Sequence, residues 1–190
     1  ESGWAMEGFA EFIAQEALGL TAPPVAGASP FLSPRGSLQS PSAAALFLRK
    51  AARLSPAGRE GLRSAWEETG AQHGDDAEAF FRAVAQRARP NGAVELLAAL
   101  VSEAVASASA PAEPSQGRPL SIGELPLAPP APLGWARVTF ERLEERTGLE
   151  VVLPDTRAAR AARAVLVYRS YSGEPDTLSL EPGSSRILPL

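Results

Sequence analysis

Cysteine is absent from the 190 residues, and histidine occurs only once, as His73. The absence of cysteine excludes disulfides, thiolate catalysis and metal centres with cysteine ligands. Asp75 and Asp76 follow His73 closely, so these three side chains form one candidate metal-binding group. The sequence favours a plainer interpretation, in which an exposed turn is followed by an aspartate that caps the next helix.

Long apolar runs and an excess of positive charge are also missing. No apolar run reaches the roughly 20 residues that cross a bilayer, so the sequence predicts no membrane span. The 18 Lys and Arg residues are mixed with 22 Asp and Glu residues. This balance is unlike the basic surface of a nucleic-acid-binding protein, and we expect no nucleic-acid partner. The sequence also contains neither a glycine-rich phosphate loop nor a G-x-S-x-G motif.

The residue types that are present are unevenly distributed along the chain. Apolar residues make up 45% of the sequence, which is enough for a packed core. Alanine, a strong helix former, is concentrated before position 110, whereas proline is spread through the rest. We therefore predict a helical part at 1–106, a proline-rich linker at 107–133 and a β-rich module at 134–190.

Helix signals fill the first part. Residues 3–18 are predicted to be helical, with Ala5, Met6, Phe9, Phe12 and Ile13 on one arc. Short joints between the helices predict antiparallel neighbours in a small bundle. Four further helices are expected to open at Ser40-Pro41, at Ser55-Pro56, at Asp75 or Asp76 and at Asn91, with Gly70 just beyond the end of the third helix.

Short β-branched and aromatic runs fill the last part. They lie at 135–143, 149–154, 163–171, 176–182 and 185–190, and glycine-containing turn signals separate them. This pattern predicts a small antiparallel β-sandwich or partial sheet, and so an α+β fold class for the whole chain. Between two of the runs, the stretch 155–163 is predicted to be a helical turn or a basic loop. Its arginines Arg157, Arg160 and Arg163 favour a solvated basic face over a site for an anionic partner.

The first predicted helix carries a short motif, WAMEGFAEF, at residues 4–12. It resembles the third-ligand helix of gluzincin zinc metallopeptidases, which in the aminopeptidase-N-like branch reads W-L-N-E-G-F-A-x-(Y/F). A less specific likeness of helix pattern extends over roughly 2–105, the second half of a gluzincin-like catalytic domain. The residues that match the motif in place are Trp4, Glu7, Gly8, Phe9, Ala10 and Phe12.

The resemblance implies roles for two carboxylates. Glu7 would be a zinc ligand that completes a site begun by two histidines on an earlier HExxH helix. Glu11, one turn further on, would orient a ligand histidine by accepting its free N–H. Gly8 would permit close approach of a neighbouring helix. The competing interpretation is a solvated helix face, because carboxylates near a helix start interact favourably with the helix dipole.

The sequence also departs from the family pattern. HExxH is absent, and Ser40, Pro41 and Ser42 stand where the family has a catalytic tyrosine. We therefore expect no peptidase activity from this chain alone. The resemblance implies the C-terminal portion of a zinc-dependent metallopeptidase that uses metal-activated water. Zinc would bind only in the full-length protein.

The same interpretation implies a peptide or protein substrate and a secreted or cell-envelope location. The imidazoles would come from a preceding segment or from another chain. One alternative is a non-catalytic binding or structural protein on a peptidase-derived scaffold. A third is an unrelated helical bundle with a β-module that serves as an interaction domain.

Overall fold

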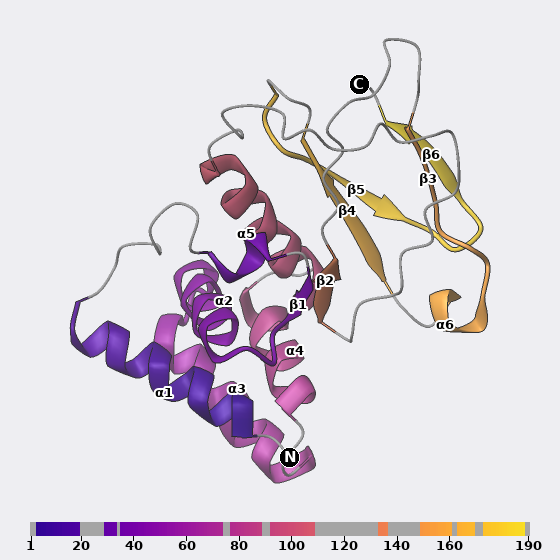
Figure 1. Cartoon of the computed structure of the whole chain (residues 1–190). Coiled ribbons are helices and arrows are strands. Elements are labelled where there is room, and N and C mark those ends of the chain that lie inside the picture. The colour runs from indigo at the N-terminus through magenta and orange to yellow at the C-terminus, as the bar shows by residue number, and fades with distance from the viewer. Residues whose placement is uncertain are drawn as a thin grey trace.

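The chain has an α+β fold, as predicted (Figure 1). The computed structural model describes residues 3–19, 29–33, 35–73, 77–88, 92–108, 133–136, 149–160, 163–169 and 173–188. Its helices are α1 (Gly3–Ala17), α2 (Pro41–Leu54), α3 (Gly58–His73), α4 (Ala77–Ala88), α5 (Ala93–Ser107) and the short α6 (Arg157–Arg160), with a 3₁₀ turn η1 (Pro30–Leu32). Its strands are β1 (Arg35–Ser37), β2 (Gly134–Ala136), β3 (Leu149–Val152), β4 (Ala164–Tyr168), β5 (Asp176–Leu180) and β6 (Ser185–Leu188).

Helix α2 lies at the centre of the helical bundle and contacts α1, α3, α4 and α5. Small residues make this possible, because alanines on three sides of α2 let neighbouring backbones come close. A phenylalanine-rich core fills the space between the helices. The buried alanines of α2 are Ala43, Ala44, Ala45 and Ala51, and the buried core phenylalanines are Phe12, Phe31, Phe47, Phe80 and Phe81.

Helix boundaries follow local signals in some places and not in others. Helix α2 begins at Pro41 after Ser40, as predicted. Helix α3 was expected to open at Ser55-Pro56, but residues 55–57 form a turn and the helix begins at Gly58, whose φ of 54° suits glycine. The expected end at Gly70 is also wrong, because α3 continues to His73. The predicted caps at Asp75, Asp76 and Asn91 lie outside the described residues.

The described strands form three antiparallel pairs, β1–β2, β3–β6 and β4–β5. The runs predicted at 149–154, 163–171, 176–182 and 185–190 each contain one of these strands. The stretch 155–163 contains a helical turn, α6, where Thr156 Oγ1 accepts a hydrogen bond from the Ala159 N–H. Hydrogen bonds from Arg160 lower the pKa of the Asp155 carboxyl beside it.

Strand β2 packs with the helical bundle. It pairs with β1, and the ring of Trp135 lies 5.0 Å from that of Phe31. Trp135 is 8% exposed, and its indole covers Gly36, where any added Cβ would overlap the ring. The first residues of the predicted 134–190 module thus lie in the core around η1. The division into domains stays a prediction, and most of the predicted linker lies outside the described residues.

Candidate metal-ligand helix

At one position, the inner face of α1 packs so closely on α2 that no side chain would fit between the helices. Ala5, Gly8 and Phe12 are the buried residues of α1. A Cβ added to Gly8 would overlap the Cβ of Ala44 in α2. The expectation that Gly8 permits close approach of a neighbouring helix is therefore confirmed.

Aromatic rings anchor α1 along its length. The ring of Trp4 stacks on Phe81 at a centroid distance of 5.1 Å. The ring of Phe9 stacks on Trp66 at 5.6 Å and meets the edge of Phe80 at 6.4 Å. These contacts fix both the position and the rotation of α1 on the bundle.

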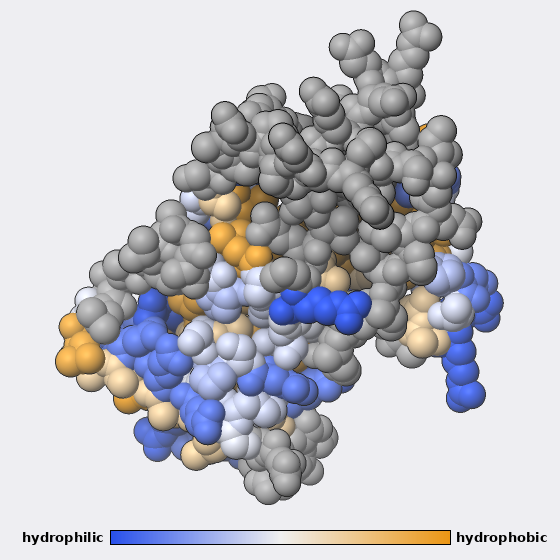
Figure 2. Space-filling view, viewed as in Figure 1, coloured by the Kyte–Doolittle hydropathy of each residue, from blue (hydrophilic) through white to orange (hydrophobic). Residues whose placement is uncertain are grey.

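The apolar arc expected for α1 is only partly right. Phe9 and Phe12 face the core, but Met6 is 53% exposed and Ile13 is 47% exposed. The reason is that α1 is apolar on nearly every side, so hydrophobic pattern alone does not select the buried face. In Figure 2, orange and tan atoms follow the outer edge of α1.

Glu7 lies on this exposed outer side, away from the face packed on α2. Within the described part of the chain, the Glu7 carboxylate has no hydrogen bond and no ion pair. The described residues also include no group of three His, Asp or Glu side chains arranged to hold a metal ion. His73 is the last residue of α3; Asp75 and Asp76 lie outside the described residues.

Glu11 lies one turn beyond Glu7 and turns toward α2. Its carboxylate accepts a hydrogen bond of 2.7 Å from Gln15 Nε2 and a long one of 3.5 Å from Ser42 Oγ. Ser42 belongs to the first turn of α2, where the helix dipole favours a negative charge. The structure thus gives Glu11 polar partners of its own. Its role in orienting a ligand histidine stays a prediction.

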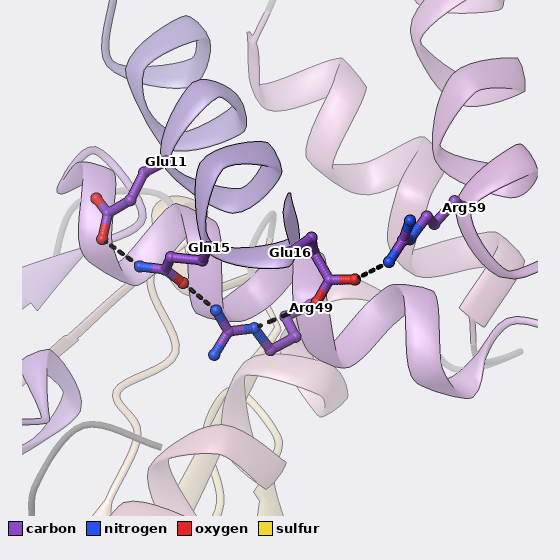
Figure 3. A network of polar contacts seen from close by, with 5 residues as sticks. All are labelled: Glu11, Gln15, Glu16, Arg49 and Arg59. Carbon is purple, nitrogen blue, oxygen red and sulfur yellow. Dashed lines mark hydrogen bonds and ion pairs between the residues drawn. The ribbon is translucent and has the colours of Figure 1, made fainter. Parts of the chain in front are cut away.

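Glu11 is one end of a polar network between α1, α2 and α3 (Figure 3). Gln15 Oε1 accepts a hydrogen bond from Arg49 Nη2, and Arg49 Nε lies 3.9 Å from a carboxylate oxygen of Glu16. Glu16 also pairs with Arg59 at the start of α3. Arg49 is only 6% exposed, so this network places a guanidinium inside the bundle.

Arg49 was not singled out from the sequence. The available signal was its position in SAAALFLRKAA, where a cation follows a run of alanines and large apolar residues. Charged residues are almost never fully buried unless they are paired. The partners Gln15 and Glu16 lie more than thirty residues earlier, so the sequence did not reveal the pairing.

Comparison with known proteins finds no matching family model, no matching curated protein and no matching solved structure. The likeness to the gluzincin ligand helix therefore depends on residues 4–12 and the helix pattern that follows them.

Proposed function

We propose that this chain is the C-terminal portion of a zinc-dependent metallopeptidase, in which Glu7 is a zinc ligand. The observation that carries the proposal is the placement of Glu7. Its carboxylate has no partner among the described residues, and it borders an exposed apolar seam on a rigidly anchored helix. A solvated helix face would more commonly be polar.

The seam has the spacing of a helix-packing surface. Its residues alternate at intervals of three and four, which is the pattern that packs one helix along another. All of them are exposed, and one of them, Met6, directly precedes Glu7. A second helix docked here would bring its own side chains next to the Glu7 carboxylate. The residues of the seam are Gly3, Met6, Ala10, Ile13 and Ala17.

In the proposed enzyme, the docked helix supplies the two imidazoles. Two neutral imidazoles and one carboxylate suit a catalytic zinc and leave a fourth position for water. When bound, the metal lowers the pKa of that water and polarises the peptide carbonyl. The part played by this chain is to hold Glu7 at a fixed angle through the Gly8–Ala44 contact and the Trp4–Phe81 stack. The substrate is a peptide or protein.

The full-length protein tests this proposal directly. We expect about one zinc ion per molecule by elemental analysis, because a three-ligand catalytic site holds one metal. Glu7→Gln should weaken zinc binding by more than the roughly 10–100-fold typical of outer-shell changes, and peptidase activity should fall with it.

Glu60→Gln is the matched control, since Glu60 is an exposed glutamate near the start of α3. It should leave zinc binding and activity unchanged. A zinc content near zero in the wild-type protein would reject the proposal and favour a non-catalytic protein on a related scaffold. Equal effects of the two substitutions would also reject Glu7 as a ligand.

A further inference from the structure

Helix α5 is covered on two sides. Leu96, Leu97 and Leu100 face the core of the bundle. Another side contacts β4 and β5, which lie beside α5 in Figure 1. We infer that Arg163 and Arg169 hold the β4–β5 hairpin against α5, and that the hairpin keeps its structure only while it is held there. This inference does not depend on the proposed peptidase function.

Arg169 joins the end of β4 to the end of α5. Its Nη1 donates hydrogen bonds to Val105 O at 2.7 Å and to Ala108 O at 3.1 Å. Its Nε donates to Gly173 O at 3.1 Å, on the way into β5. The last carbonyls of a helix have no partner within the helix, and the helix dipole favours a cation there. One side chain therefore donates hydrogen bonds both to carbonyls at the end of α5 and to a carbonyl just before β5.

Arg163 joins the start of β4 to the start of α5. Its Nη2 lies 2.9 Å from Glu95 Oε1. Glu95 is in the first turn of α5, and its side chain is only 19% exposed. Its other carboxylate oxygen is buried without a hydrogen bond from any described residue, so Arg163 is an important partner for this charge.

The distance between the two arginines along β4 matches the distance between their partners along α5. From Glu95 to Ala108 a helix rises about 20 Å at about 1.5 Å per residue. From Arg163 to Arg169 a strand covers about 20 Å at about 3.3 Å per residue. Strand β4 therefore runs alongside α5 in the same direction, with one arginine at each end. A slip of one residue in β4 would turn both arginines to the opposite face of the strand, away from α5.

Apart from its contacts with α5, the hairpin has the β4–β5 ladder and an exposed hydrogen bond from Tyr168 OH to Asp176 Oδ2. It is a two-stranded sheet, and an isolated pair of strands is marginal in water. Every residue of β4 is partly buried, in keeping with contact along the whole strand. We therefore expect the hairpin to open when its attachment to α5 is weakened, while the bundle remains folded.

Hydrogen–deuterium exchange of the whole chain, read by mass spectrometry, tests this inference. In Arg169→Met, amides of β4 should exchange at least about tenfold faster than in wild type, because charge-assisted hydrogen bonds are lost. Amides of α3, which is distant from the hairpin, should change less. Arg163→Met should give a smaller increase of about twofold to threefold, because its side chain is 68% exposed.

The matched control is Arg186→Met, which removes an exposed arginine from β6. It should leave exchange in β4 as in wild type. If the Arg169→Met protein has lost the circular dichroism signal of its helices, exchange is measured in Arg169→Lys instead. Lysine keeps the charge but cannot reach all three carbonyls. Exchange in β4 that is unchanged in the Arg169 variant, or changed equally by Arg186→Met, would overturn the inference.

Discussion

At Gly8, α1 and α2 meet with no space for a side chain. The glycine is buried, and a single added methyl would overlap Ala44. Backbone atoms of α2 also lie close to the added Cβ, with Pro41 O at 3.2 Å and Ala44 Cα at 3.6 Å, so relief of the overlap requires a shift of the helices themselves. The position of Glu7 one residue earlier depends on the same contact.

Substitution of Gly8 by alanine should therefore be unfavourable despite the better helix propensity of alanine. We expect Gly8→Ala to lower the free energy of unfolding by about 1–3 kcal/mol, the usual range for overpacking. Urea denaturation measures the change. Gly3→Ala is the control, because Gly3 has open space around its Cα and should lose nothing. A stabilised Gly8→Ala would show that the helices are not in close contact here.

At the scale of elements, Arg49 links α2 to α1. Its guanidinium is buried and interacts with Gln15 and Glu16 in the last turn of α1. Removal of one partner from a buried ionic group is generally costly, because the remaining groups lose their compensation. The network thus adds directional polar contacts to an interface between α1 and α2 that is otherwise apolar.

Arg49→Met keeps an apolar stem and removes the charge. We expect it to lower the free energy of unfolding by about 2–4 kcal/mol. The adjacent Lys50 pairs with Glu103, whose side chain is 57% exposed, so Lys50→Met should lower it by less than about 1 kcal/mol. Urea denaturation of both variants checks the difference. Equal losses would mean that the buried network contributes no more than a surface ion pair.

At the scale of the whole molecule, Trp135 brings a late part of the chain into the early core. It is buried against Phe31 and Gly36, about one hundred residues earlier in sequence. Its strand β2 pairs with β1, and Leu38 N–H donates to Leu133 O. The helical bundle is therefore completed by residues outside the predicted 1–106 part.

Loss of this ring should destabilise the bundle. We expect Trp135→Ala to lower the free energy of unfolding by about 3–5 kcal/mol, as for other large-to-small changes in a core. Trp66→Ala should lower it less, because Trp66 is 38% exposed. Urea denaturation, followed by the circular dichroism of the helices, measures the free energy of unfolding of both variants. A Trp135 variant no less stable than the Trp66 variant would contradict the placement of β2 in the core.

Local signals were sufficient for much of the secondary structure. Ser40-Pro41 predicted the start of α2, and β-branched runs predicted β3, β4, β5 and β6. These features depend on a few adjacent residues, which the sequence presents directly. Strand β1, in contrast, was not predicted, because the residues at 35–37 carry no β-branched side chain and depend on a distant partner.

The candidate site divides in the same way. The sequence by itself predicted a helix at residues 3–18, which the structure bounds at Gly3–Ala17, and it contains the motif that places Glu7 beside Gly8. Only the tertiary structure decided which side of that apolar helix is buried, that Glu11 turns toward Ser42, and that Arg49 and Arg169 join distant elements. The reason is physical. Helix periods and turn preferences are local properties, whereas burial and pairing depend on residues that folding alone brings together.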